Sequence, residues 1–323
     1  MKAIQIRDDA LVWADAAEPE LGPGMVRIAV AATSVNRADL VQRAGHYPPP
    51  PGASEILGLE CAGEVLEVGD GVTRVRPGDA VCALLAGGGY AEQVVVPAGQ
   101  VLPVPAGFDA IRAAAVPEVF ATAYLNLYME AALAKGERAL LHAGASGVGT
   151  AAIQLCKAFH NPCFVTAGSA DKISRCEALG ADGGADRNQG DFREAVKAWS
   201  GGAGADVILD PVGAGYLESN LRCLNTGGRL VLIGLMSGAE AQISLGQLMV
   251  KRARLIGSTL RARPTSEKAA VMDALETHVW PLLESGAVAP VIETVVPIRE
   301  AERAHALVAG NTTVGKVVVS LQT

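Results

Sequence analysis

A run of small residues near the middle of the chain has the spacing of a nucleotide-binding turn. Residues 144–149 read Gly-Ala-Ser-Gly-Val-Gly and lie between a short apolar run, 139–143, and an apolar pattern with helical spacing. In a strand–turn–helix unit, small residues let backbone N–H groups approach a pyrophosphate, and the helix N-terminus adds partial positive charge. Gly144 and Gly149 match two glycines of the dinucleotide pattern G-x-G-x-x-G, whereas Ser146 replaces the middle one. The run predicts a slightly displaced dinucleotide with a serine hydroxyl pointing towards it; an ordinary strand–turn–helix is the alternative.

The end of the next predicted strand, 162–167, indicates which dinucleotide fits. Folds that select NAD place an acidic side chain there, about 20 residues beyond the glycines, to bind the ribose 2′-hydroxyl. Here the strand runs into Gly-Ser-Ala-Asp-Lys at 168–172, so no acid stands at its tip. Ser169 and Lys172 lie within reach of a 2′-phosphate, which predicts NADPH. In the alternative interpretation Ser169 only caps the following helix, Lys172 is solvated and Asp171 serves as the ribose acid.

The elements that position these residues alternate between strand and helix patterns. Their strands are continuous apolar runs, as expected of a parallel sheet covered on both faces, and six of them make a doubly wound domain. They are predicted at Arg138–Ala143, Pro162–Ala167, a short piece near Ala185, Ala205–Asp210, Arg229–Gly234 and Ala253–Ser258. The turns 210–213 and 234–236 follow the fourth and fifth strands, at the carboxyl edge where such sheets bind ligands.

The first third of the chain is predicted to be a barrel-like β domain, because short strands alternate with glycine and proline turns. The strands are predicted at Lys2–Arg7, Met25–Ala32, Gly63–Val68, Ala80–Leu85 and Ala91–Pro97. A short helical segment covers 34–40, and Tyr47 precedes four prolines that form a stiff extended stretch.

The end of the chain has too few elements for a domain of its own. A helix is predicted over Thr265–Glu284, a second over Glu300–Ala309 and a closing strand over Gly315–Leu321. We expect these pieces to return to the first domain. The expected organisation is therefore a β domain at 1–119 and 264–323, and a parallel-sheet domain at 120–263.

Composition and charge disfavour several classes of protein. A net charge of −7 over 323 residues gives no basic surface for nucleic acid and no cationic face for a membrane. No apolar run is as long as a membrane span, and the first residues lack the apolar core of a signal peptide, so we expect a cytoplasmic protein. The six cysteines form no C-x-x-C pair and predict reduced, buried thiols. No His-x-x-x-His or Cys/His cluster supports a metal site.

Several further motifs carry a family resemblance. They are, in order, Asn36–Leu40 with Gln42–Gly52, Ile56–Glu60, Arg76–Asp79, Gly87–Pro97, His142–Leu155, Thr166–Ser169, Gly234–Met236 and Gly315–Lys316. On these motifs the chain resembles the zinc-free quinone oxidoreductases of the medium-chain dehydrogenase/reductase superfamily over essentially its whole length, most closely the p53-inducible group. The resemblance implies a GroES-like β-barrel domain, a Rossmann domain and NADPH-dependent transfer of hydride or single electrons to small quinones, ortho-quinones included. It also implies a homodimer whose Rossmann sheets join edge to edge through Arg229–Leu235 and Ala253–Ser258.

The chain departs from the zinc-dependent relatives of that family where they hold a catalytic metal. Their cysteine and histidine ligands correspond to Asn36, or an immediate neighbour, and to Leu59. Leucine cannot ligate a metal and asparagine is a poor zinc ligand, so no metal site is expected. Their lobe of four closely spaced cysteines is also absent between Cys82 and Tyr90. Without a metal to polarise an alcohol, electron-poor acceptors such as quinones or activated alkenes are favoured.

The candidate catalytic residues are Asn36, Tyr47 and Ser146. Tyr47 is expected to hydrogen-bond a quinone oxygen or stack on its ring, and a loop aromatic packed on the prolines is the alternative. Water could protonate the quinone oxyanion, so a protein acid need not be essential; His142 is predicted to be a core histidine. By resemblance, Arg187 stands where the family places an aromatic residue near the 2′-phosphate. The candidate cofactor-binding residues are Thr122, Gly144, Ser146, Gly147, Val148, Gly149, Gly168, Ser169, Lys172, Arg187, Gly234, Leu235, Met236, Arg261, Arg263 and Lys316.

Two other functions fit the same scaffold. One is an NADPH-dependent reductase of enones or enoyl thioesters. The other is a cofactor-binding protein with a non-enzymatic role, because zinc-free relatives include lens crystallins.

Overall fold

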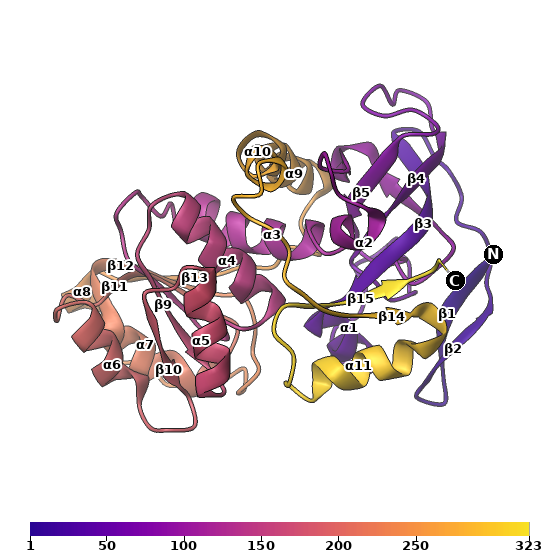
Figure 1. Ribbon diagram of the computed structural model, residues 1–323. Coiled ribbons are helices and arrows are strands. Elements are labelled where there is room, and N and C mark those ends of the chain that lie inside the picture. Colours follow the sequence, from indigo (N-terminus) through magenta and orange to yellow (C-terminus); the bar gives the residue numbers. More distant parts are fainter. Residues whose placement is uncertain (323) are drawn as a thin grey trace. The chain divides into compact units, whose positions relative to one another are not determined.

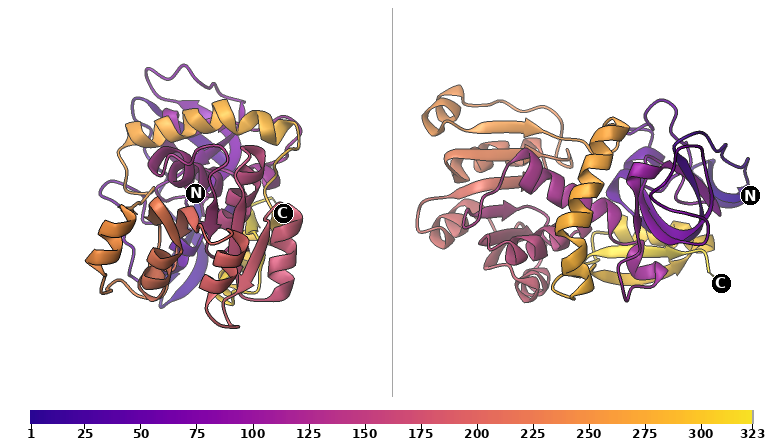
Figure 2. Two further views of the ribbon diagram at one scale, coloured as in Figure 1. Left: turned by 90° about the vertical axis from the view of Figure 1, so that its left-hand side faces the viewer. Right: turned by 90° about the horizontal axis from the view of Figure 1, so that it is seen from above.

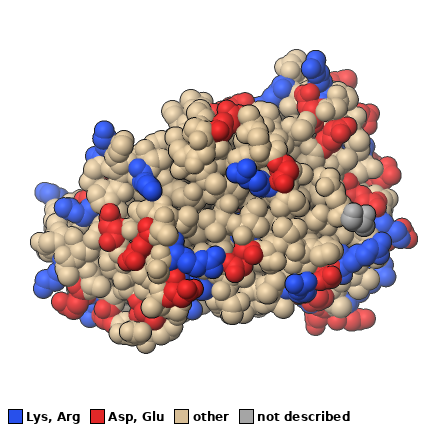
Figure 3. Space-filling view, in the orientation of Figure 1, with Lys and Arg blue, Asp and Glu red and all other residues tan. Residues whose placement is uncertain are grey.

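The computed structural model describes residues 1–322 and divides the chain into two compact units (Figure 1). Unit 1 comprises Met1–Ala121 with Leu260–Thr323, and unit 2 comprises Thr122–Thr259. No helix within residues 1–322 is long and apolar enough to cross a membrane. On the face drawn in Figure 3, basic and acidic side chains are intermixed and do not form one continuous basic surface.

Unit 2 is built on a six-stranded parallel sheet in the order β10-β9-β8-β11-β12-β13. Its strands are β8 (Ala139–Leu141), β9 (Cys163–Ala167), β10 (Gly183–Asp186), β11 (Ala205–Asp210), β12 (Leu224–Leu232) and β13 (Arg254–Gly257). From β8 the chain first adds β9 and β10 on one side. It then returns to the other side of β8 and adds β11, β12 and β13. The doubly wound sheet predicted from the apolar strand pattern is therefore confirmed.

Helices cover both faces of this sheet (Figure 2). They are α4 (Gly147–Ala158), α5 (Ala170–Leu179), α6 (Phe192–Trp199), α7 (Leu217–Cys223) and α8 (Leu245–Lys251), with a 3-10 turn at Ala214–Tyr216. Because strand side chains alternate between faces, Leu140, Ile208 and Leu230 from three adjacent strands form one core, and Phe192 of α6 and Leu221 of α7 pack into it. Before the sheet, α3 (Pro117–Tyr124) continues into a π-helical segment, Leu125–Glu130.

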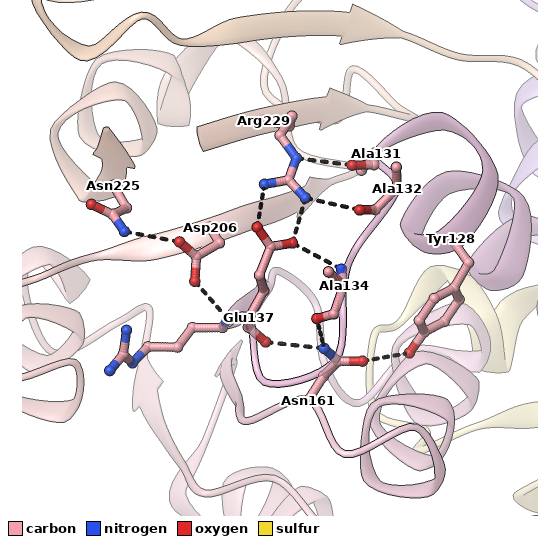
Figure 4. A network of polar contacts seen from close by, with 10 residues as sticks. Tyr128, Ala131, Ala132, Ala134, Glu137, Asn161, Asp206, Asn225 and Arg229 are labelled. Carbon is pink, nitrogen blue, oxygen red and sulfur yellow. Dashed lines mark hydrogen bonds and ion pairs between the residues drawn. The ribbon is translucent and has the colours of Figure 1, made fainter. Parts of the chain in front are cut away.

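A network of polar contacts lies near the amino ends of β8 and β11 (Figure 4). The guanidinium of Arg229 binds both carboxylate oxygens of Glu137, at 2.5 and 2.9 Å, and donates to the carbonyls of Ala131 and Ala132. Arg229 lowers the pKa of Glu137. Beside this pair, Asp206 accepts from the backbone amide of Arg138 and from the side chain of Asn225. These contacts fix the end of the sheet opposite to its carboxyl edge.

Unit 1 contains a seven-stranded sheet in the order β14-β15-β3-β4-β5-β7, with β6 also paired to β3. Its strands are β3 (Met25–Val35), β4 (Glu60–Val68), β5 (Ala80–Leu84), β6 (Gln93–Pro97), β7 (Val101–Pro103), β14 (Ile292–Pro297) and β15 (Lys316–Ser320), and β1 (Lys2–Arg7) and β2 (Ala10–Asp15) form a separate hairpin. The closing strand β15 runs antiparallel to β3, so the end of the chain joins the N-terminal sheet. The register pairs Val317 with Val35, and Thr33 with Cys61. It therefore brings the ends of β3, β4 and β15 to one place.

The helices of unit 1 differ from prediction at three points. They are α1 (Arg37–Arg43), α2 (Ala110–Ala113), α9 (Thr265–His278), α10 (Trp280–Glu284) and α11 (Ala301–Ala309), with 3-10 turns at Ala98–Gln100 and Ile298–Glu300. The helix α1 begins at Arg37 and not at residue 34, α2 was not predicted, and the single helix predicted over Thr265–Glu284 is broken between α9 and α10. Pro281, in the first turn of α10, has no N–H to continue the helical ladder. The strands β2, β7 and β14 were not predicted, because β7 has only three residues and the other two show no clear alternation of apolar and polar residues.

All six cysteines are buried and free, which confirms the prediction of reduced thiols. Burial raises the pKa of Cys176 and Cys223 to about 12, so these thiols stay protonated at neutral pH.

Candidate functional site

The glycine turn of unit 2 is fixed by close backbone packing. A Cβ on Gly144 would lie 2.6 Å from the Cβ of Val165 on β9, and one on Gly149 would lie 2.5 Å from the carbonyl oxygen of Ala143. Both positions therefore require glycine, for close approach of strand and helix rather than for an unusual φ.

Ser146 is the N-cap of α4. Its Oγ accepts from the N–H of Gly149 at 3.0 Å. The hydroxyl oxygen thus accepts from its own helix, while its hydrogen is still able to donate, so a hydroxyl that points towards the cofactor stays a prediction. The cap leaves the amides of Gly147 and Val148, the first two of the helix, without intrahelical acceptors. These amides can bind a phosphate at the N-terminus of this 12-residue helix.

Basic and polar side chains surround Gly168 at the end of β9. The guanidinium of Arg187 lies beside it, so close that a Cβ on Gly168 would be 3.4 Å from Nη2. Asn188 donates to the Gly168 carbonyl at 2.9 Å and fixes this corner. Ser169 Oγ accepts from the Lys172 amide at 3.3 Å and caps α5, and a contact of its hydroxyl with a 2′-phosphate stays a prediction. The corner has the charge and the donors to hold a phosphate monoester.

Two loops meet at the carboxyl edge of β11 and β12. Asp210 ends β11 fully buried, and its Oδ1 accepts from the amides of Val212 at 2.6 Å and Gly213 at 3.2 Å. Burial raises the pKa of Asp210 to about 6. Gly213 has φ +86°, and a Cβ there would lie 3.1 Å from Cα of Leu235. The loop 234–236 is thus held against this turn, with Leu235 58% exposed and Met236 50% exposed, free to contact a ligand.

In unit 1, a buried polar cluster lies where β3, β4 and β15 meet. Glu60 is completely buried and Lys316 is 3% exposed, and their charged groups are 2.8 Å apart. Glu60 Oε1 also accepts from Ser34 Oγ and from Asn36 Nδ2, the latter at 2.9 Å, while Oε2 accepts from the Glu118 amide. Lys316 was predicted from the family resemblance to contact cofactor; the structure gives it these internal partners.

The direction of the Asn36 amide is determined by this cluster. Lys316 Nζ donates to Asn36 Oδ1 at 2.6 Å, and Asn36 Nδ2 donates to Glu60. A flipped amide would place its N–H groups against an ammonium and its oxygen against a carboxylate. Nδ2 carries a second hydrogen, for which residues 1–322 offer no acceptor. Asn36 can therefore donate this hydrogen to a ligand.

The residues around Asn36 do not fit a zinc ion. Its amide oxygen is occupied by the Lys316 ammonium, and Leu59 is a buried aliphatic side chain without a donor atom. Within the described part of the chain, no group of three or more His, Cys, Asp or Glu side chains could hold a metal.

Tyr47 lies beneath Arg261 in unit 1. The guanidinium carbon of Arg261 is 5.2 Å from the ring centroid, and Arg261 donates to the Tyr47 carbonyl at 3.1 Å, to Gln42 and to the Ala86 carbonyl. Burial raises the pKa of Tyr47, and the Arg261 charge opposes this shift. The Tyr47 hydroxyl has no hydrogen-bond partner among residues 1–322, which leaves it available to a ligand.

The structure thus brings candidate residues together in two pairs in unit 1 and in one group in unit 2. In unit 1, Asn36 contacts Lys316, and Tyr47 contacts Arg261. In unit 2, three features lie at the carboxyl edge of one sheet: the glycine turn, the basic corner formed by Arg187 and Asn188 around Gly168, and the loop 234–236. Two candidates stand apart from these contacts: Arg263 pairs with Glu267 at 3.0 Å, and Thr122 is buried in α3.

Sequence reasoning missed two residues of these groups, Glu60 and Asp210, as organisers of the polar clusters. An acidic residue at either end of an otherwise apolar strand was the signal that could have identified them. His142 was predicted to be a satisfied core histidine, and this is confirmed: its two ring nitrogens pair with Thr166 and Asn220.

Two family sequence models match the chain. Residues 22–106 match the alcohol dehydrogenase GroES-like domain, and residues 147–277 match the zinc-binding dehydrogenase model. The predicted combination of a GroES-like domain with a Rossmann domain is therefore confirmed.

Curated relatives fall into two groups. The chain is 42% identical, over 70% of its length, to the pikromycin polyketide synthase component PikAII of Streptomyces venezuelae, but it spans only 6% of the length of that protein. It is 28% identical to the quinone oxidoreductase-like protein 2 homolog of Nematostella vectensis, over 93% of this chain and 82% of that one.

Solved structures match the whole chain. An NAD-dependent alcohol dehydrogenase is 30% identical with a TM-score of 0.87, covering 99% of this chain and 100% of its own. A mycobacterial protein complexed with NADPH is 28% identical with a TM-score of 0.88, covering 99% and 100%. The Escherichia coli quinone oxidoreductase complexed with NADPH is 27% identical with a TM-score of 0.85, covering 99% and 98%. The chain therefore belongs to the medium-chain dehydrogenase/reductase superfamily, as an oxidoreductase-type member with quinone oxidoreductase-like homologues.

Proposed function

We propose that this protein is an NADPH-dependent, zinc-independent reductase of small quinones. The observation that carries the proposal is the fixed amide of Asn36, held between Lys316 and Glu60 so that an N–H remains for a ligand. A quinone oxygen accepts a hydrogen bond and becomes more negative as electrons arrive. A fixed donor therefore stabilises the reduced state more than the starting quinone.

The basic corner of unit 2 supports NADPH as the reductant. The guanidinium of Arg187 lies beside Gly168, Lys172 lies in the first turn of α5, and no acidic side chain stands at the tip of β9 to bind a free 2′-hydroxyl. Two similar structures contain NADPH. When bound, NADPH supplies the hydride. The chain's own residues hold it, with the amides of Gly147 and Val148 at the pyrophosphate and the basic corner at the 2′-phosphate.

A second candidate function is the reduction of activated alkenes, such as enones or enoyl thioesters. The 42% identity with a polyketide synthase component favours it. Both substrate classes present a conjugated oxygen to the Asn36 donor, and they differ in the atom that receives the hydride. A cofactor-binding protein without turnover is the third possibility, since the residues proposed to hold NADPH belong to unit 2 and Asn36 belongs to unit 1.

We also propose a homodimer in which the unit 2 sheets of two copies join. β13 is the last strand of its sheet, and its outer edge pairs with no other strand among residues 1–322. Apolar side chains are exposed on it and on the neighbouring α8: Leu255 is 37% exposed, Met249 76% and Val250 81%. An unpaired edge with apolar flanks suits a second copy of the same strand.

The free thiols agree with a reducing compartment, for which we propose the cytoplasm.

A substrate panel tests the proposed reaction. NADPH oxidation by the purified protein is measured with 1,2-naphthoquinone, a cyclic enone and an enoyl thioester, and NADP⁺ reduction is measured with primary alcohols. We expect the quinone to give the highest kcat/KM and the alcohols none. A faster enone or enoyl thioester would replace the proposal with the second candidate, and NADPH binding without any turnover would support the third.

Removal of the Lys172 charge tests the cofactor site. We expect Lys172→Ala to weaken NADPH binding by about 1.5–3 kcal/mol, the usual contribution of a charge-assisted hydrogen bond, and to leave NADH binding unchanged. Lys197→Ala, an exposed lysine on α6 of the same unit, is the matched control. Both affinities are measured by fluorescence titration. Unchanged NADPH affinity in Lys172→Ala would remove this lysine from the site.

Substitution of Asn36 and Tyr47 separates the roles of donor and acid. We expect Asn36→Ala to lower kcat with 1,2-naphthoquinone about 10²–10³-fold, as for loss of one oxyanion donor. Tyr47→Phe should cost less than about tenfold, because water can protonate the product, whereas an essential acid would contribute about 10²–10⁴. NADPH affinity and thermal midpoint report whether each variant is folded. Near-normal turnover in a folded Asn36→Ala would refute the donor role.

A charge on α8 tests the dimer. We expect wild-type protein to have twice the monomer mass by light scattering, and Val250→Glu to be monomeric because a carboxylate cannot be buried unpaired in an apolar interface. Leu66→Glu, at a 43% exposed site in unit 1, is the control and should remain dimeric. A monomeric wild type would refute the proposal.

A further inference from the structure

Four buried polar side chains form a continuous chain across unit 2, apart from the candidate site residues. Thr166 and His142 are each 2% exposed, and Asn220 and Asp210 are completely buried. His142 Nδ1 is 2.9 Å from Thr166 Oγ1, His142 Nε2 is 2.6 Å from Asn220 Oδ1, and Asn220 Nδ2 donates to Asp210 Oδ2 at 2.9 Å. Three of the four residues stand at or just beyond the carboxyl ends of the adjacent strands β9, β8 and β11.

The carboxylate of Asp210 determines the direction of every bond in this chain. A carboxylate can only accept, so Asn220 must turn its NH₂ towards Asp210 and its oxygen towards His142. An amide oxygen also only accepts, so Nε2 of His142 carries the proton. Burial lowers the pKa of His142 to about 4, so the ring is neutral and its Nδ1 accepts from the Thr166 hydroxyl.

The two ends of this hydrogen-bonded series, Asp210 and Thr166, hold the loops that we assign to NADPH. At one end, Asp210 Oδ1 binds the amides of Val212 and Gly213, and Val212 in turn accepts from the Ser237 amide at 2.7 Å beside the loop 234–236. At the other end, the carbonyl of Thr166 accepts from the amide of Gly144, the first glycine of the turn, at 2.9 Å. One hydrogen-bonded series therefore joins the glycine turn, the end of β9 and the loop after β12.

We propose that Asp210 is a positioning residue for the cofactor: by fixing the Asn220 amide and the His142 tautomer, it holds the three cofactor loops of unit 2 in one arrangement. The inference rests on the proposed binding of NADPH. Asp210 does not itself contact the cofactor in this proposal, because both of its oxygens are occupied by Asn220 and by its own turn.

In Asp210→Asn, the donors and acceptors of this hydrogen-bonded series are expected to exchange roles. A side-chain amide has one acceptor oxygen and one donor NH₂. When the oxygen of the new amide accepts from Val212 and Gly213, its NH₂ faces Asn220. Asn220 must then flip and donate to Nε2, and the proton of His142 moves to Nδ1. All partners up to Thr166 remain satisfied. The variant is therefore expected to fold with the opposite tautomer.

The matched control lies on the same strand. Asp206, at the start of β11, also accepts from a backbone amide and from an asparagine NH₂, those of Arg138 and Asn225 (Figure 4). Asp206→Asn makes the same chemical change and removes the same charge, but at the amino end of the sheet.

The experiment combines histidine ring nitrogen NMR with NADPH titration on the full-length protein. Using ¹⁵N-histidine-labelled protein, with the His142 signals assigned by their loss in His142→Gln, we expect protonated Nε2 in the wild type and in Asp206→Asn, and protonated Nδ1 in Asp210→Asn. We expect the Kd for NADPH to rise about tenfold in Asp210→Asn, because a neutral amide oxygen holds the amides of Val212 and Gly213 less strongly than a carboxylate does, and to stay within about twofold in Asp206→Asn.

The outcomes are separable. A wild-type His142 that is charged or protonated on Nδ1 would overturn the inference, as would an Asp210→Asn protein that reverses the tautomer but binds NADPH like the wild type. An equal loss of affinity in both variants would also overturn it, because the effect would then be general destabilisation. Failure of the wild type to bind NADPH would refute the proposed function, while the tautomer measurement would still report on the chain.

Discussion

Buried carboxylates at the ends of strands fix the direction of the polar groups around them, and the candidate residues of each unit depend on this constraint. Glu60 in unit 1 and Asp210 in unit 2 are completely buried, and each accepts from an asparagine NH₂. Because a carboxylate cannot donate, each asparagine has a single possible orientation. The remaining groups of each amide are then determined as well. Asn36 presents an N–H donor, and Asn220 presents its oxygen as an acceptor for His142.

The two carboxylates are stabilised differently. Glu60 is paired with Lys316 and accepts three further hydrogen bonds, which together offset the loss of hydration; removal of one partner from such a pair costs about 3–5 kcal/mol. Asp210 accepts from two backbone amides and Asn220. Burial alone raises its pKa, to about 6, so it remains mostly ionised at neutral pH. An ion pair therefore holds the cluster in unit 1, and oriented dipoles hold the one in unit 2.

Much of the scaffold could be predicted from sequence, because it depends on local pattern. The apolar strand runs gave the doubly wound sheet, and the spacing of Gly144 and Gly149 gave the turn whose packing requires both. The clusters could not be predicted, because they depend on register between distant segments. Lys316 reaches Glu60 only because β15 pairs with β3 antiparallel, across more than half of the chain. Local pattern also did not show that Ser146 bonds to its own helix, since capping and ligand binding require the same residue type.

A fixed asparagine donor also limits which acceptors the proposed enzyme can reduce. Its orientation is held by charges on both sides, so it does not reorganise when negative charge develops on the substrate. Its contribution is still that of one hydrogen bond, about 2.7–4 kcal/mol by comparison with oxyanion-hole donors, and it lacks the full charge of a Lewis acid. A substrate bound there must therefore bring its own electrophilicity, as quinones and conjugated carbonyl compounds do. In the proposed function, Asn36 and Leu59 stand where the family resemblance places metal ligands, and the strength of the interaction that remains selects the substrate class.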